Sequence, residues 1–384
     1  MKKSLVALAA LAATSVFAQS SVSITGYFDR GYTVTDNTDN TKDLKTFSSS
    51  AGTTAIKFNV VQDLGGGLKA GFLSETNPSD VGGIGQDSAP SANVATSGNA
   101  SQAGAFNNGE SFLNLSGGFG EIRLGSPNNE LLTAAIGVAA PGLSTGVGSS
   151  YSSSWSIFNG IGTGATGFVG IARAGAIGAT GTGVRGIRQA NTIKYISPAV
   201  NGFKFAYGQA GKNNNNPAAG GDTAGYTDMS LRYTNGPLDV MYASLKVDTT
   251  TNDTNNTQVA AGTTALGKSY THSLLGATYT MGAFKIHAGT GGTKSDEATV
   301  KTKGTMYGVS YTMGQWDFMA QQAKANDQAT SNNDRKMTGL GANYNFSKTV
   351  RGYLRYDSLN YNSSAAASAG SAVKRTALGM SVTF

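Results

Sequence analysis

The sequence predicts an all-β fold, a transmembrane antiparallel β-barrel of sixteen strands with short turns at one rim and long loops at the other. Three observations predict it. Apolar and polar residues alternate in many short segments, the connections between these segments alternate in length, and only 13% of the residues are charged. Alternation with a period of two is typical of strands that have one apolar and one polar face.

The alternating segments cover the chain from Ser21 onward. In the first of them, Val22, Ile24 and Phe28 share one face, and Ser23, Thr25 and Asp29 share the other. An even number of such segments suits a closed single-chain barrel, which leaves no strand edge unpaired. The remaining fifteen predicted strands are 56–60, 67–75, 111–116, 121–125, 192–197, 203–208, 229–234, 238–247, 272–280, 284–289, 306–312, 316–321, 338–346, 350–357 and 376–384.

The connections fall into two classes that alternate along the chain. The short ones, such as 63–66, 117–118 and 235–237, contain glycine, which tolerates the positive φ of tight hairpins. Short turns at one rim and long loops at the other are the layout of outer-membrane barrels. The long, polar connections are 35–53, 76–109, 126–189, 211–225, 248–268, 294–304, 324–334 and 360–372.

The apolar face of the strands is predicted to meet lipid. A water-soluble barrel of sixteen strands would be too wide for side chains to fill, so an apolar lining would enclose a dry hollow. If the apolar face of each strand contacts lipid and the polar face lines a water-filled lumen, both faces lie in a suitable environment. Low-complexity disorder is a poorer account, because 16 Tyr and 16 Phe recur in the alternating segments. The absence of cysteine excludes a disulfide scaffold and a thiolate metal site.

Residues 1–18 have the pattern of a secretory signal peptide. Lys2 and Lys3 precede an apolar run, and Ala18 is a small residue at the expected cleavage position. We therefore expect residues 19–384 to form the barrel domain after export through the periplasm. The formal net charge of +7 is modest, and nothing in the sequence indicates a nucleic-acid partner or a cofactor.

Four segments resemble the trimeric general diffusion porins of Gram-negative bacteria, of the beta-proteobacterial type. They are 21–29 (SVSITGYFD), 63–72 (DLGGGLKAGF), 115–125 (LSGGFGEIRLG) and 191–198, and the resemblance extends over the whole mature chain. The terminal Phe384, which follows an alternating strand, resembles an outer-membrane assembly signal. The resemblance implies a homotrimer in outer-membrane lipid, a third loop folded into the pore, and passive diffusion of small hydrophilic solutes.

That third loop would be residues 126–189. A connection of this length without secondary structure is uncommon and is usually functional. The runs 131–138 and 157–179 are unusually apolar for a surface loop. This composition suits a segment that packs against the inner wall of the barrel and narrows it.

The chain departs from the anion-selective members of that family. Where those members carry arginine on the second strand, this chain has Ala55 and Asn59, and where they carry arginine next to the fourth and fifth strands it has Glu110 and Ser126. The arginine cluster of the family therefore cannot be carried over. Ion preference has to be argued from the charges that are present.

Strand parity predicts which charges line the pore. A positive field focused in a narrow channel favours anions, so we expect an anion preference, although some of these side chains could simply be solvated wall. Parity directs Arg30 outward, and the acids Asp29, Glu110, Glu121 and Asp357 would pair with neighbouring cations or offset the field. The predicted pore and constriction residues are Lys57, Glu110, Arg123, Arg173, Arg185, Arg188, Lys194, Lys204, Arg232, Arg351, Arg355 and Arg375.

Other functions find less support in the sequence. His272 and His287 lie on adjacent predicted strands, but no Gly-x-Ser-x-Gly elbow accompanies them, so an enzyme is not expected. The oxygen-rich run 36–40 lacks the spacing of a calcium loop. Three alternatives stay open: a substrate-dedicated channel, a surface adhesin or receptor barrel whose long loops bind a partner, and a structural barrel without an open pore.

Overall fold

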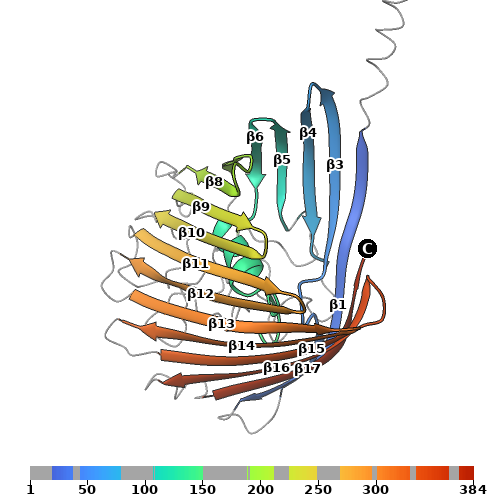
Figure 1. Cartoon of the computed structure of the whole chain (residues 1–384), viewed down its shortest axis with the longest axis vertical. Helices are drawn as coiled ribbons and strands as arrows, with labels where there is room; N and C mark the ends of the chain where they lie inside the picture. The colour runs from blue at the N-terminus through green and yellow to red at the C-terminus, as the bar shows by residue number, and fades with distance from the viewer. Residues whose placement is uncertain are drawn as a thin grey trace, which may run out of the picture.

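The sheet closes on itself, because the first strand of the chain pairs with the last (Figure 1). The computed structural model describes residues 20–37, 44–78, 107, 109–149, 188, 191–211, 225–248, 269–295, 301–328, 334–362 and 372–384. Every strand pair in this part of the chain is antiparallel, and each barrel strand pairs with its neighbours in sequence. The predicted closed antiparallel barrel of sixteen strands is confirmed.

The barrel strands are numbered from β1 to β17, and β2 is a short additional strand. Their bounds are β1 Ser21–Asn37, β2 Leu44–Ser48, β3 Ala55–Gly65, β4 Leu68–Thr76, β5 Ser111–Gly117, β6 Gly120–Ser126, β7 Thr192–Ile196, β8 Phe203–Ala210, β9 Gly225–Asn235, β10 Leu238–Asp248, β11 Ser269–Met281, β12 Phe284–Ser295, β13 Lys301–Met313, β14 Trp316–Asp327, β15 Asp334–Asn345, β16 Val350–Asn362 and β17 Ala372–Thr383. A helical turn, α2 Glu130–Ala134, continues into one turn of π-helix, η1 Ala135–Ala139.

The two ends of the chain complete the ring. β1 and β17 pair from Tyr27↔Thr383 to Asn37↔Val373. Beyond this ladder, the Gly26 N–H donates to the Phe384 carbonyl at 2.9 Å and the Phe384 N–H donates to the Gly26 carbonyl at 3.1 Å. The Phe384 ring lies over Gly26, where a Cβ atom would come within 2.3 Å of it. Glycine at position 26 thus leaves room for the terminal aromatic ring.

The apolar residues of the strands point outward, as the alternation predicts. Leu113, Ile193 and Leu378 are each more than 60% exposed, although they are large hydrophobic residues. Their sequence neighbours on the opposite face are buried or half-buried inside the barrel. Exposed apolar side chains on every strand are expected where lipid, rather than water, surrounds the protein. No helix among the described residues is long and apolar enough to cross a membrane.

The sequence prediction was wrong about several strand ends and about three small elements. Segments 294–304 and 324–334 were expected to be loops, but β12, β13, β14 and β15 extend into them. These extensions carry polar residues on both faces, so alternation of hydrophobicity does not mark them. The short strand β2, which pairs with β1, and the helical turns α2 and η1 were not predicted either. Residues 1–18 lie outside the described residues.

Deleting Phe384 should reduce the yield of folded barrel, because it removes both backbone hydrogen bonds to Gly26. Phe384→Ser, which keeps these bonds and loses only the ring, should have a much smaller effect. The measurement is the heat-resistant fraction on SDS gels after refolding. Phe346→Ser is a matched control, since Phe346 is also an outward aromatic, 60% exposed against 55% for Phe384. Equal folding of the deletion and the wild type would contradict this account of closure.

Candidate functional site inside the barrel

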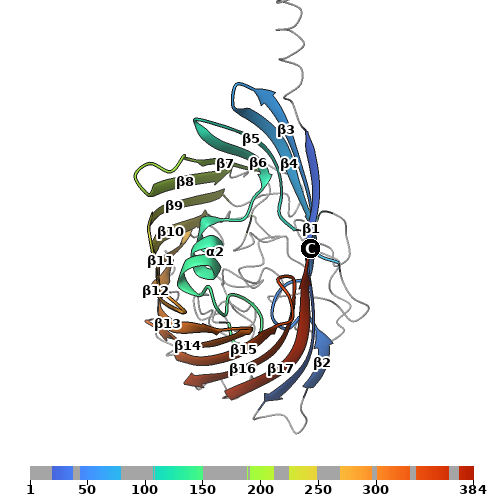
Figure 2. The ribbon, with the colours of Figure 1, turned by 45° about the vertical axis from the view of Figure 1, so that its right-hand side comes forward.

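Residues 127–149, which we call the inner loop, enter the lumen directly after β6. Figure 2 shows α2 inside the barrel, beside β10 and β11. The helical turn begins at Asn129, whose side-chain oxygen accepts the Leu132 N–H at 2.7 Å. An asparagine in this position satisfies a backbone donor that the helix leaves unpaired. Glu130 in the first turn complements the positive end of the helix dipole.

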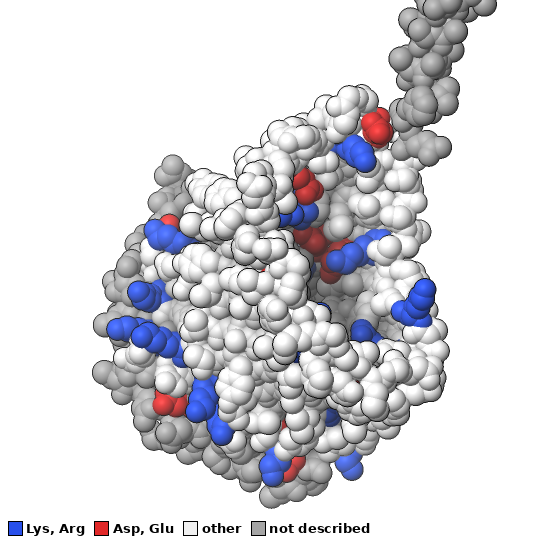
Figure 3. Space-filling model, viewed as in Figure 1, with Lys and Arg blue, Asp and Glu red and all other residues white. Residues whose placement is uncertain are grey.

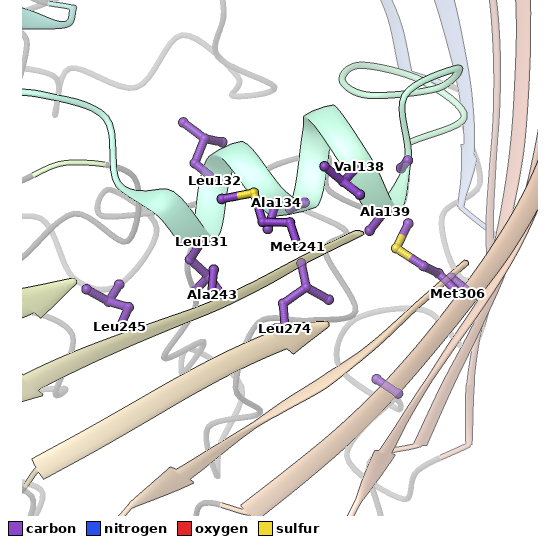
Figure 4. Packing of buried hydrophobic residues seen from close by; sticks show 14 of the residues in the cluster. Leu131, Leu132, Ala134, Val138, Ala139, Met241, Ala243, Leu245, Leu274 and Met306 are labelled. Carbon is purple, nitrogen blue, oxygen red and sulfur yellow. The ribbon is translucent and has the colours of Figure 1, made fainter. Parts of the chain in front are cut away.

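The inner loop is fixed to the wall by an apolar contact. Leu131, Ala134 and Val138 are fully buried and pack against inward side chains of β10, β11 and β13 (Figure 4). Fully burying one leucine stabilises a protein by roughly 1.5–3 kcal/mol. The apolar run 131–138 therefore packs on the inner wall, whereas the run 157–179 lies outside the described residues. The inward wall residues of this cluster include Met241, Ala243, Leu245, Leu274, Met306, Ala323, Met337 and Leu359.

Glycines in the wall allow the inner loop to approach the strands closely. A Cβ atom at Gly289 would come within 2.8 Å of the Ala139 side chain, and one at Gly339 would come within 2.0 Å of the Gly148 carbonyl oxygen. The second contact involves backbone on both sides, which cannot move aside like a flexible side chain. These glycines could not be predicted from the sequence, because glycine in a strand has many other causes.

One end of the inner loop is held by a buried charge pair. The Asp228 carboxylate on β9 accepts the Glu130 N–H at 2.9 and 3.0 Å. Lys194 on β7 lies 3.2 Å from the same carboxylate and 2.5 Å from that of Glu130. The lysine ammonium also donates to the Asn128 carbonyl at 2.8 Å. Both Asp228 and Lys194 are almost completely buried, so each needs these partners.

The other end is held in the same way by a second pair. The Asp357 carboxylate on β16 accepts the Gly148 N–H at 2.8 Å. Arg375 on β17 donates to both oxygens of this carboxylate, at 3.1 and 2.7 Å. Beside this contact, the Val147 N–H donates to the Ser50 carbonyl at 2.7 Å. The inner loop thus spans the lumen between β9 and β16.

The segment before β3 also folds inward, against Asp29. The Asp29 carboxylate accepts the backbone N–H groups of Ala51 and Gly52 at 2.7 and 2.9 Å and the Tyr353 hydroxyl at 2.6 Å. The residue is completely buried and has its hydrogen bonds from neutral donors. The prediction that Asp29 faces inward agrees with its place in the structure. Its carboxylate holds a loop instead of pairing with a cation.

Three predicted pore cations outside the loop anchors pair with carboxylates in the lumen, and a fourth, Lys204, lies beside one of the three. Lys57 lies 3.0 Å from Glu75, and Arg123 lies 2.9 Å from Glu121 and 3.7 Å from Glu110. Arg232 lies 2.5 Å from Asp239. Lys204 is exposed on β8, opposite Arg232 in the ladder. Figure 3 shows basic and acidic side chains together in the hollow at the centre of the view.

Three further predicted cations have neutral partners. Arg188 donates to the Asn128 side-chain oxygen at 3.0 Å, and Arg351 donates to the Ser381 hydroxyl at 3.0 Å. The Arg355 guanidinium lies 5.6 Å from the centre of the Tyr353 ring. Within the part of the chain that is described, no carboxylate lies within salt-bridge distance of these three. Arg173 and Arg185 lie outside the described residues, so their place in the pore stays a prediction.

The two histidines are inward wall residues. A ring nitrogen of His272 lies 2.8 Å from the Thr293 hydroxyl, and His287 is buried beside Gly308. Among the described residues no group of three or more His, Cys, Asp or Glu side chains could hold a metal ion. Most of the oxygen-rich run 36–40 lies outside the described residues.

A family model described as Gram-negative porin matches residues 4–364. The chain belongs to this family. It is 30% identical over 363 residues to outer membrane porin protein 32 of Delftia acidovorans, covering 92% of this chain and 88% of that protein. Among solved structures it is similar to the anion-selective porin from Comamonas acidovorans, with a TM-score of 0.66, 23% identity, and coverage of 95% and 100% of the two chains.

The porin fold extends to more distant structures. OmpT of Vibrio cholerae matches with a TM-score of 0.61 at 13% identity, over 95% of this chain and 98% of that one. The chain is therefore an outer-membrane porin of a Gram-negative bacterium, and proteins of this family and fold are channels, not enzymes.

Asp357→Ala should release one end of the inner loop and leave Arg375 buried without its partner. Breaking a buried ion pair by removing one member costs about 3–5 kcal/mol. We expect a lower thermal midpoint and added flicker in single-channel current. The double variant Asp357→Ala/Arg375→Ala should recover much of the stability while the flicker persists. If the single-channel current of both variants showed no more flicker than that of the wild type, the pair of Asp357 and Arg375 would not be what holds the inner loop.

Proposed function

We propose that this porin is a passive diffusion channel for small hydrophilic solutes and ions, with a preference for anions, and that it works as a homotrimer. Residues 1–18 would be the signal peptide, 19–384 the porin domain, and 126–189 the loop that narrows the pore. Trimerisation is supported by a solved structure of Vibrio cholerae OmpT described as a trimer form, with a TM-score of 0.57. An anion preference is supported by the similarity to an anion-selective porin.

One observation in the lumen carries the anion preference. In the ion pairs that line the open part of the wall, the cation is more exposed than its acid. The side chain of Lys57 is 38% exposed against 8% for Glu75, and that of Arg232 is 33% exposed against 24% for Asp239. Arg123 is 25% exposed against 22% for its closer partner Glu121 and 11% for Glu110.

The most deeply buried inward acids hold loops rather than face the pore. Asp29, Asp228 and Asp357 are each at most 3% exposed. The half-buried Arg351 and the exposed Lys204 add positive charge without a carboxylate within salt-bridge distance among the described residues. An ion in the lumen therefore meets ammonium and guanidinium groups more often than carboxylates. A field of this sign raises the local concentration of anions.

The reversal potential of the refolded protein in a planar bilayer, under a potassium chloride gradient, tests this proposal. We expect a chloride-directed potential. The triple variant Lys57→Gln/Lys204→Gln/Arg351→Gln should lower the permeability ratio of chloride to potassium at least twofold. Lys336→Gln, which removes an outward lysine, is the control and should leave the ratio unchanged. A potassium-directed potential in the wild type would overturn the anion preference and leave the channel function intact.

A higher salt concentration should weaken the preference for chloride over potassium. The screening length is about 10 Å at 0.1 M salt and about 3 Å at 1 M. The permeability ratio should therefore move towards one between these two concentrations, if fixed charges set it. A ratio independent of salt would point instead to a specific solute site. Block of the current by one added solute would favour the alternative of a substrate-dedicated channel.

A further inference from the structure

Among the described residues four methionines point into the barrel, and one of them differs from the rest. Met241, Met306 and Met337 belong to the apolar cluster that holds the first half of the inner loop, and Figure 4 shows Met241 and Met306 beside its helical turns. Met319 on β14 lies outside this cluster, under the second half of the loop. It is 7% exposed, against at most 2% for the other three. Met319 is therefore the inward methionine most accessible to water.

Met319 belongs to one inward row of the wall that also holds two polar side chains. The antiparallel ladders place it directly opposite Ser310 on β13 and Gly341 on β15, and they place Gly341 directly opposite Arg355 on β16. A Cβ atom at Gly341 would clash with the Arg355 guanidinium and would come within 3.1 Å of the Met319 methyl group. The absence of a side chain at this glycine thus lets methionine and arginine meet above it.

Arg355 lacks a strong hydrogen-bond acceptor, although it is 5% exposed. Its Nη1 group donates to Met319 Sδ at 3.8 Å, and a thioether sulfur is a weak acceptor. Its Nε group is buried and has no hydrogen-bond partner. Buried polar groups in folded proteins are nearly always paired. A stronger acceptor at the position of the Met319 sulfur would supply the partner that this guanidinium lacks.

A second buried donor lies on the other side of the methionine. The Ser310 hydroxyl is buried and has no hydrogen-bond partner. A Cβ atom at Gly142 of the inner loop would clash with this hydroxyl and would come within 3.3 Å of Met319 Cγ. The hydroxyl and the methionine side chain therefore lie side by side under Gly142. Met319 has an unsatisfied donor on either side.

Small polar molecules have hydrogen-bonding partners around this sulfur. The Asn343 side-chain oxygen, two residues after Gly341 on the same face of β15, is also buried without a partner. Polar atoms of this kind are the places where buried water binds. Hydrogen peroxide carries the same donors and acceptors as water and is little larger. It can reach Met319 from the water-filled lumen.

We propose that Met319 is an oxidation site, at which hydrogen peroxide from the lumen converts the thioether to the sulfoxide. The sulfur attacks the near oxygen of the peroxide, the O–O bond breaks, and the far oxygen leaves as hydroxide. The hydrogen on the near oxygen passes to this hydroxide, which becomes water, so sulfur loses two electrons and the peroxide gains them. Arg355 donates a hydrogen bond to the leaving oxygen, on which negative charge develops.

The product satisfies the donors that the thioether leaves unsatisfied. The sulfoxide oxygen is a strong acceptor, and it lies within reach of the Arg355 guanidinium and of the Ser310 hydroxyl. Oxidation of a methionine usually disrupts its packing, because it turns an apolar side chain into a polar one. At Met319 the added oxygen instead supplies a missing partner. The oxidised side chain thus links β13, β14 and β16 beneath the inner loop.

Met337 provides an internal comparison. It is 1% exposed and lies directly opposite Ala323 and Leu359, which are buried apolar residues. These ladder neighbours offer no side-chain donor to a sulfoxide oxygen. Oxidation of Met337 would bury a polar group in an apolar contact, which is unfavourable.

The first experiment exposes the refolded oligomer in lipid vesicles to hydrogen peroxide and assigns each added oxygen by tandem mass spectrometry. Met319 should be oxidised at least fivefold faster than Met337. Arg355→Leu should slow the reaction at Met319 at least threefold and leave that at Met337 unchanged. The matched control Arg351→Leu, which removes another inward arginine of β16, should change neither rate. Equal rates at the two methionines, or an unchanged rate at Met319 in Arg355→Leu, would overturn the proposal.

A second experiment tests the geometry without an oxidant, because glutamine at position 319 supplies a permanent carbonyl oxygen. Met319→Gln should have a thermal midpoint higher than that of Met319→Leu by about 2 °C or more. The difference should disappear when both substitutions are made together with Arg355→Leu. Each variant is first shown to be folded by its heat-resistant band on SDS gels. If the two variants had the same midpoint with Arg355 present, ordered water would already satisfy the guanidinium, and the proposal would fail.

Discussion

Hydrocarbon offers no hydrogen bonds, so each backbone N–H and C=O group in the membrane must find a partner within the protein. In this chain that requirement is met by pairing β1 with β17, which leaves no free edge in the sheet. The rest of the structure depends on this closed ring of strands. The closed sheet creates an inside and an outside, and the two-residue period of the strands then assigns each side chain to water or to lipid.

The inner surface of the barrel is not polar throughout. From β9 to β16, inward methionine, leucine and alanine residues form a dry patch that the inner loop covers. The loop therefore occupies one side of the lumen, and the charged side chains of β3 to β8 face what remains open. Two carboxylates, those of Asp228 and Asp357, hold the loop ends through backbone N–H groups. Arg375 on the adjacent strand β17 neutralises Asp357, whereas Asp228 on β9 shares the ammonium group of Lys194, two strands away on β7, with Glu130.

The sequence predicted the architecture well, because alternation and turn chemistry are local. All sixteen barrel strands, the outward apolar residues and the inward position of residues such as Lys57 and Arg351 follow from parity. The partners of these charges could not be predicted. The Asp29 carboxylate could bind an arginine or two backbone N–H groups of a loop, depending on where residues 49–54 fold. No local sequence pattern predicts the position of that segment. The close contact at Gly339 was missed for the same reason.

The anchors of the inner loop also bear on the order of assembly. Glu130 is held by a residue 98 positions later in the chain, and Gly148 by one 209 positions later. The second anchor needs both β16 and β17, which are the last strands to be synthesised. Long-range contacts of this kind form late, since a large loop must close first. The narrow part of the channel is therefore set only when β16 and β17 are in place, in the same step that closes the ring through the pairing of β1 with β17.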